Sequence, residues 1–161
     1  MIAGNPKQRF YDESLLRRAI EFHGHGGPFM VIGLRMGLLA LEELNARGWF
    51  DIEVEAELNW APPDSCILDG IQVSTGCTIG KRNIRVKEQR DIAAAVFTKG
   101  EHGVRVEVRG EVLSHVREEM KDGDHVENEY EHEAENLKLM KELAAKPACQ
   151  LFIVSRFRVT P

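Results

Sequence analysis

Two histidines separated by a single glycine, His23 and His25, lie in the segment Phe-His-Gly-His-Gly-Gly-Pro at residues 22–28. Imidazole nitrogens bind transition metals, and glycines let a ligand come close to the backbone. Pro28 suits the first position of a helix, whose free N–H groups attract an anion. Taken alone, a His-Gly-His pair is a weak signal, because an exposed capping loop explains it equally well.

Two cysteines, Cys66 and Cys77, stand in a second segment that also contains several glycines. Their spacing does not match a zinc-ribbon pair, which needs a two-residue gap. A helix N-terminus at Cys66 and the positive charge of Lys81 near Cys77 would each favour the thiolate, the form that binds metals. The alternative is packing, because free cysteines are among the most buried residue types.

Together the two segments offer His23, His25, Cys66 and Cys77 as ligands for a tetrahedral Zn²⁺ or a softer transition metal. His125, Glu129 and His132 share one helical face and could form an alternative metal site. The stronger interpretation is a solvated surface, because an acidic run at a helix start usually marks one. We expect ordinary surface positions for His102 and His115, and packing for Cys149.

Elements that would hold these residues can be read from hydrophobic periodicity and capping signals. The pattern predicts a helix over 15–22 capped by Ser14, and another from Pro28 to a stop at Arg47-Gly48. A helical turn from Asp64 or Ser65 should run through Ile71 and end at Gly76. The remaining expected elements are strands over 52–58, 83–86, 91–98, 104–108 and 151–159, and helices over 111–121 and 126–145.

Strands and helices do not alternate regularly in this order, which favours an α+β fold with a mainly antiparallel or mixed sheet of about five strands. We expect one domain over residues 1–161. Within the second helix, Gly33 and Gly37 stand four residues apart and leave a groove for close packing against the sheet or a partner helix.

Composition narrows the function classes. The chain has 161 residues, 43% of them hydrophobic and 29% charged, with a formal net charge of −5, as in an ordinary globular protein. This balance gives no general attraction to nucleic acid or membrane, and no apolar run is long enough to span a bilayer or form a signal peptide. We therefore expect a cytoplasmic protein with no nucleic-acid or membrane partner. Walker, Rossmann and Gly-x-Ser-x-Gly motifs are absent from the sequence.

The combined motifs resemble a known family. Phe-His-Gly-His followed by Pro, then Gly-Leu-Arg-Met-Gly, then Asp-Ser-Cys-Ile-Leu-Asp-Gly-Ile-Gln-Val-Ser-Thr-Gly-Cys-Thr-Ile-Gly-Lys, is similar to the E-subunit family of molybdenum or tungsten formylmethanofuran dehydrogenase. The resemblance is strong over residues 14–100 and looser over the rest. It implies an α+β metal-binding domain, commonly a homodimer. From the imidazole and thiolate ligand set we expect a divalent transition metal, with zinc as the first choice.

Carried over residue by residue, the resemblance implies His23, His25, Cys66 and Cys77 as metal ligands. Asp69, Gln72, Thr75 and Lys81 would line the site, and in an enzyme Lys81 or Asp69 would act in proton transfer or anion binding. This chain differs from the family in two ways. Members often have a cysteine where Gly27 stands, and many carry a C-terminal ribbon with two Cys-x-x-Cys pairs, which is not found before Pro161.

Two functions remain open. In the first, the chain is a metalloenzyme, or a subunit of a molybdenum or tungsten oxidoreductase, whose metal keeps a position open to water or a small anionic ligand. In the second, it is an accessory or binding module whose metal is purely structural. For the open site we expect one histidine to bind the metal and the other to face the pocket. His25 is preferred as the ligand and His23 as the pocket residue.

Overall fold

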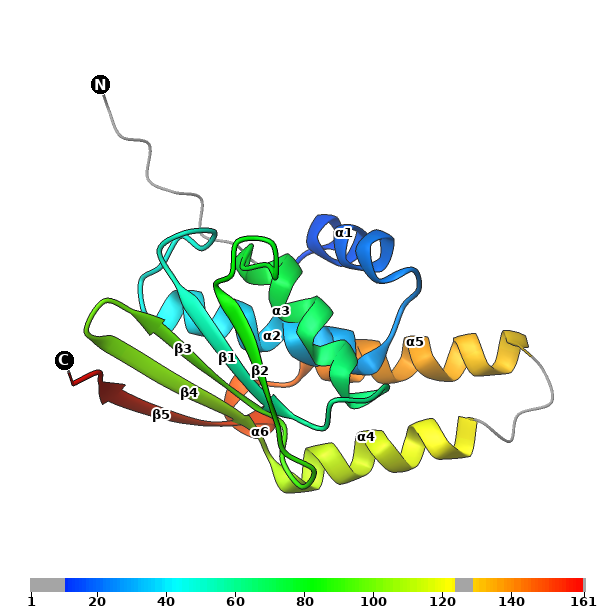
Figure 1. Ribbon diagram of the computed structural model, residues 1–161. Coiled ribbons are helices and arrows are strands. Elements are labelled where there is room, and N and C mark those ends of the chain that lie inside the picture. The colour runs from blue at the N-terminus through cyan, green and yellow to red at the C-terminus, as the bar shows by residue number, and fades with distance from the viewer. Residues whose placement is uncertain (1–10, 124–128, 161) are drawn as a thin grey trace.

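A mixed five-stranded sheet forms one layer of the molecule, with strand order β2-β1-β3-β4-β5 (Figure 1). The computed structural model describes residues 11–123 and 129–160. Strand β1 (Glu53–Leu58) runs parallel to β2 (Ile84–Glu88) and antiparallel to β3 (Ala94–Lys99). The α+β class and the mixed sheet expected from the sequence are therefore confirmed.

The other half of the sheet is antiparallel. Strand β4 (His102–Val108) forms a hairpin with β3, and β5 (Phe152–Arg158) adds the outer edge. The Gly-containing segment at 99–103 predicts this hairpin. Strand β5 follows directly after a short helix, α6 (Ala148–Leu151), which the local sequence pattern does not predict.

Helices cover one face of the sheet (Figure 1). Alternation in β1 makes this possible, because Val54, Ala56 and Leu58 are buried while the intervening glutamates are partly or fully exposed. Helix α2 (Pro28–Glu43) crosses behind the sheet and is buried along most of its length. A helix that is apolar on nearly all sides must be surrounded by other elements.

Helix α1 (Glu13–His23) ends at the His-Gly-His loop. Its N-cap is Asp12, whose side chain accepts the Leu15 N–H at 2.8 Å, so the expected Ser14 cap is wrong by two residues. The helix stops at Gly24, which adopts φ +96°. This left-handed conformation is accessible to glycine at low cost and turns the chain towards α2.

Helix α2 is shorter than expected. Asn45 adopts φ +47°, and the Ala46 N–H donates to the Leu41 carbonyl, which closes the helix before the expected stop at residue 47.

Helix α3 (Ile67–Thr75) follows a 3₁₀ turn, η1 (Asp64–Cys66), and ends at Gly76 with φ +76°, as the sequence predicts.

Helices α2 and α3 cross at very close range, which confirms the packing expected for Gly33 and Gly37. A Cβ atom on Gly33 would lie 2.0 Å from the Ile67 carbonyl oxygen, and one on Gly37 would lie 1.9 Å from Oγ of Ser74. A Cβ atom on Gly70 of α3 would likewise lie 2.1 Å from the Met30 carbonyl oxygen. The partner is α3 of the same chain, and this contact fixes where the start of α3 lies.

Helices α4 (Gly110–Gly123) and α5 (Glu129–Ala145) form a pair that extends beyond the sheet (Figure 1). Leu139, Met140 and Leu143 of α5 are buried in the common core. His125 lies outside the described residues, as does the expected start of this helix at 126. No helix in the described ranges is sufficiently long and apolar to cross a membrane.

Candidate functional site

A partly buried imidazole–carboxylate pair joins α1 to α3. The Nδ1–H of His23, the last residue of α1, donates to Oδ2 of Asp69 in the first turn of α3 at 2.6 Å. The His23 side chain is 8% exposed and that of Asp69 is 34% exposed. Asp69 therefore orients the ring of His23 and leaves Nε2 as its free atom.

Nε2 of His23 is buried and has no hydrogen-bond partner among the described residues. A buried polar atom without a partner is costly, and native structures satisfy nearly all of them with protein, water or a ligand. The orphaned atom therefore marks a place where something else binds.

His25 lies against His23 at the surface. The two ring centroids are 4.6 Å apart, with an angle of 40° between the planes. Nδ1 of His25 is 2.9 Å from the Gly26 carbonyl oxygen, to which it donates, so Nε2 is the acceptor on this ring too. His25 is exposed, which gives this side of the pair access to solvent.

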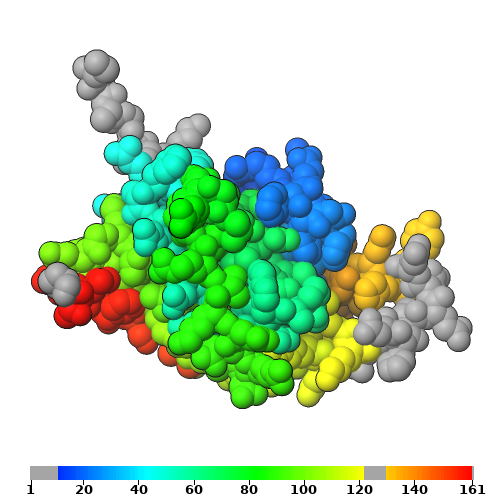
Figure 2. Space-filling view, in the orientation of Figure 1, coloured from blue at the N-terminus to red at the C-terminus, as the bar shows by residue number. Residues whose placement is uncertain are grey.

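Gly27 is the N-cap of α2 and lies beside both rings. A Cβ atom at this position would be 3.8 Å from Nε2 of His23 and 3.8 Å from Cε1 of His25. The backbone at Gly27 is extended, with φ −151°, so a side chain is allowed there without strain. On the other side of the loop, a Cβ atom at Gly26 would lie 3.0 Å from the sulfur of Met140 in α5. The His-Gly-His loop thus lies at the junction of α1, α2, α3 and α5, with α1 against α3 on the outer surface (Figure 2).

Cys66 lies at the N-cap of α3, three residues before Asp69, and is half-buried. Burial raises the pKa of its thiol, and the negative charges of Asp69 and Asp64 raise it further. This reverses the expectation of a lowered pKa, because burial and two carboxylates outweigh the helix N-terminus. A metal cation at this end of α3 would offset their effect.

Cys77 is not brought to the histidines. It follows Gly76 at the opposite end of α3, and a nine-residue helix rises about 1.5 Å per residue, or roughly 14 Å. Two thiolates bound to one zinc ion must each lie about 2.3 Å from it, so Cys66 and Cys77 do not share one ion in this fold. Cys77 is fully buried, and its thiol donates to the Ile52 carbonyl at 3.4 Å.

Burial raises the pKa of Cys77, outweighing the hydrogen bond from Thr75 and the positive charge of Lys81, which lower it. Lys81 does lower the pKa of this thiol, as expected, but the thiol is not activated because burial has the larger effect.

Two other residues expected at the site, Thr75 and Lys81, lie near the Cys77 end of α3. Thr75 accepts the Cys77 N–H and donates to the Ile71 carbonyl, which makes it part of the end of α3. Nζ of Lys81 lies 5.7 Å from the ring centroid of Phe50, near the Cys77 end. Gln72 is half-buried in the middle of α3. Of the expected site residues, the structure brings together His23, His25, Asp69 and, at the same end of α3, Cys66.

In the ranges 11–123 and 129–160, no group of three or more His, Cys, Asp and Glu side chains is arranged to hold a metal ion. The expected four-ligand set is thus not assembled in the described part of the chain. The alternative set on the acidic segment involves His125, which lies outside the described residues.

One charged pair near the site was not expected from the sequence. Asp64 is 3% exposed, and Arg117 of α4 donates to both of its carboxylate oxygens. Arg117 thereby ties α4 to η1, which ends at Cys66. No local pattern could have revealed this contact, because it depends on how α4 packs.

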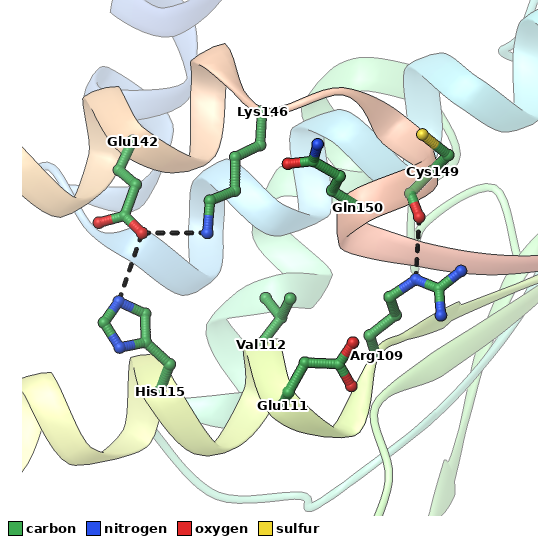
Figure 3. A pocket seen from close by; sticks show the side chains of 8 residues that line it. All are labelled: Arg109, Glu111, Val112, His115, Glu142, Lys146, Cys149 and Gln150. Atoms are coloured by element: carbon green, nitrogen blue, oxygen red, sulfur yellow. Dashed lines mark hydrogen bonds and ion pairs between the residues drawn. The ribbon is translucent and has the colours of Figure 1, made fainter.

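A separate cavity of about 520 Å³ lies between α4, the end of α5 and α6 (Figure 3). Oε1 of Glu142 lies 3.4 Å from Nε2 of His115 and 3.1 Å from Nζ of Lys146. The Nε–H of Arg109 donates to the Cys149 carbonyl at 2.9 Å. None of the expected metal ligands lines this cavity. Cys149 is exposed in α6, so the expectation that it packs in the interior is wrong.

The fold and the site together define an α+β domain that carries a partly buried imidazole–carboxylate pair where helices meet on one face of a mixed sheet. A family model described as FmdE, Molybdenum formylmethanofuran dehydrogenase operon, matches residues 22–153. The chain belongs to this FmdE family, which confirms the resemblance seen in the motifs.

One curated relative, a probable S-adenosyl-L-methionine-binding protein from Archaeoglobus fulgidus, is 37% identical over 123 residues. The match covers 67% of this chain and 32% of the relative, so the chain spans about a third of that protein's length. A crystal structure of a tungsten formylmethanofuran dehydrogenase FmdE-like protein from Syntrophus aciditrophicus matches with a TM-score of 0.64 and 21% identity. The match covers all of this chain and 79% of the other, and at this identity it supports the fold.

Proposed function

We propose that this chain binds one divalent transition metal ion, zinc being the first choice, at Nε2 of His23 instead of at His25 alone, the ligand preferred from the sequence. The observation that carries the proposal is the buried Nε2 without a partner among the described residues, on a ring whose Nδ1–H is held by Asp69. Histidines that bind metals almost always donate the other ring N–H to a carboxylate or a backbone carbonyl. Both histidines meet this condition, since His25 donates to the Gly26 carbonyl.

The residues at this end of α3 fit such an ion chemically. His25 offers a second imidazole, and Cys66 offers a thiol close to Asp69. Imidazole and thiolate ligands suit zinc. Since the described side chains are not arranged as a three-ligand group, Cys66 would have to move towards the histidines on binding, and three protein ligands would then leave a fourth position for water or a small anion. Exposure of His25 favours this open arrangement over a closed structural site. When bound, zinc would supply Lewis acidity to whatever occupies the open position.

The first test is metal analysis of protein purified without added metal. We expect one ion per chain, and loss of the ion in His23→Ala. In Asp69→Asn, metal affinity should fall by about 10–100-fold, because the amide orients the ring less firmly than the carboxylate. Cys149→Ser is the control, since Cys149 lies at the separate cavity. Equal metal content in all four proteins would rule the site out.

A gain of affinity is the second test. In Gly27→Cys, the Cβ atom would lie 3.8 Å from Nε2 of His23, which brings a thiolate within reach of the ion. We expect tighter zinc binding in this variant and none of that gain in Gly27→Ala, which adds the same Cβ without sulfur. X-ray absorption should then show one additional sulfur ligand. An unchanged spectrum would place the ion elsewhere.

The curated relative suggests a second candidate, binding of S-adenosyl-L-methionine, because it shares 37% identity over 123 residues with this chain. Isothermal titration with S-adenosyl-L-methionine tests this directly. Saturable binding by the full chain would support it, whereas no heat of binding would assign that property to the other two thirds of the relative.

A further inference from the structure

The N-terminus of α2 is buried without a cap. Its N-cap residue is Gly27, which has no side chain to accept the first N–H groups, and the first turn has no acidic residue. Pro28, Phe29 and Met30 are all buried. A buried helix end whose N–H groups have no acceptor is unusual, because each such group is costly to remove from water.

The free donors are the N–H groups of Phe29 and Met30. Pro28 has no N–H, and the next amide, of Val31, already donates to the Gly27 carbonyl at 3.2 Å. None of the described residues accepts from Phe29 or Met30. This 16-residue helix also carries a partial positive charge at its start, which favours an anion there.

A second, independent feature points to the same place. Nε2 of His23, on a side chain that is only 8% exposed, also has no partner among the described residues. It lies 3.8 Å from where a Cβ of the N-cap residue would be, so it faces the start of α2. An orphaned imidazole nitrogen and an uncapped helix end therefore border one spot.

We propose that a small carboxylate binds at this spot, with one oxygen accepting the N–H groups of Phe29 and Met30 and the other facing Nε2 of His23. The carboxylate would occupy the open position of the metal site proposed above. Only its contact with His23 rests on that proposal, because the ion would lie between Nε2 and the carboxylate.

Size and charge favour a compact carboxylate over phosphate. A single added Cβ at Gly27 would be in van der Waals contact with both rings, so the rings border this spot closely. The α2 terminus supplies about half an elementary charge. A monoanion is less costly to bury there than a dianion, because the cost of removing an ion from water rises with its charge.

The test is an NMR titration of ¹⁵N-labelled full-length protein with acetate, with and without zinc. We expect the amide signals of Phe29 and Met30 to shift in a saturable way with acetate, and not with chloride at the same ionic strength. Tighter binding of inorganic phosphate than of acetate would overturn the choice of a carboxylate. Signals that move no more with acetate than with chloride would overturn the site.

A matched pair of variants checks the position. In Gly27→Ser, the hydroxyl can cap the N–H groups of α2, so acetate should bind about tenfold more weakly, as expected from the strength of such a cap. In Gly27→Ala, the same Cβ is added without an acceptor, so acetate should lose less affinity than in Gly27→Ser. Equal acetate affinity in the two variants contradicts the proposal.

The two proposals fail in different ways. Zinc content and zinc affinity are measured without acetate, so absence of zinc binding overturns the metal site. The metal-free titration still reports whether the start of α2 takes the carboxylate.

Discussion

At the scale of single residues, the two cysteines that look alike in the sequence have different surroundings. Cys66 stands beside Asp69 at the histidine end of α3, whereas Cys77 is fully buried at the other end and donates to the Ile52 carbonyl. Cys66 can therefore assist the proposed metal site, whereas Cys77 packs in the core.

The two Cys→Ser variants should therefore separate metal binding from stability. Cys66→Ser should lower zinc content at little cost in stability, because the side chain is half-buried. Cys77→Ser should keep wild-type zinc content and lose about 1–3 kcal/mol of unfolding free energy, since it buries a more polar group. Metal analysis and urea denaturation measure the two effects. A loss of zinc in Cys77→Ser would contradict the structure.

Asp51 gives a prediction for pH dependence. Burial alone would raise its pKa, but the N–H groups of Arg47 and Gly48 and the Lys99 ammonium lower it below its usual value. A carboxylate with a lowered pKa stabilises the fold above its unfolded-state pKa of about 3.9, and this contribution disappears as pH falls through the folded-state pKa.

Asp51→Asn should therefore melt at a lower temperature than wild type at pH 7. The difference in melting temperature should shrink below about pH 4, where the wild-type carboxylate becomes protonated and is then neutral, like the amide. Melting curves from about pH 2 to pH 7 measure this, with exposed Asp91→Asn as the control. A constant difference across the whole range would show that the charge of Asp51 does not contribute.

At the scale of elements, the close crossing of α2 and α3 determines where Asp69 lies. The backbones meet at Gly33 and Gly70, where an added side chain would overlap the backbone of the opposite helix. Since Asp69 precedes Gly70, any widening of this crossing also moves the carboxylate away from His23.

Gly33→Ala should thus lower both stability and metal affinity. An added Cβ would lie 2.0 Å from the Ile67 carbonyl oxygen, and overpacking of this kind typically costs about 1–3 kcal/mol. Gly110→Ala in α4 is the matched control, because nothing lies within 4 Å of its added Cβ. Denaturation and zinc titration of both variants measure the effect. Similar results for the two would show that the crossing adjusts freely.

At the scale of the whole molecule, the Arg117–Asp64 pair connects the outer helix α4 to the turn that precedes the site. The partners are 53 residues apart in sequence. Nη2 of Arg117 also donates to the Arg90 carbonyl oxygen at 3.4 Å. One guanidinium thus holds three segments together.

Removing the charge of Asp64 should destabilise the fold. Asp64→Asn should lower the unfolding free energy by about 1–3 kcal/mol, the usual cost of weakening a buried hydrogen bond to a charged group. Arg117→Lys keeps the charge but loses the forked geometry and should show a part of this loss. Urea denaturation measures both. Wild-type midpoints for the two variants would show that the pair does not stabilise the fold.

The sequence alone determined the class of fold, the family and the order of most elements. Alternation in β1, the Gly76 stop and the 99–103 hairpin were readable because strand period, helix caps and tight turns depend on neighbouring residues. The His-Gly-His loop before Pro28 was readable for the same reason.

Only the tertiary structure decided which of the candidate residues meet. His23 and Asp69 are 46 residues apart, and their contact depends on how α1 and α3 pack on α2. The separation of Cys66 from Cys77 depends on α3 being a full nine-residue helix instead of a short turn. Such contacts arise from packing between distant segments, and local periodicity carries no record of them.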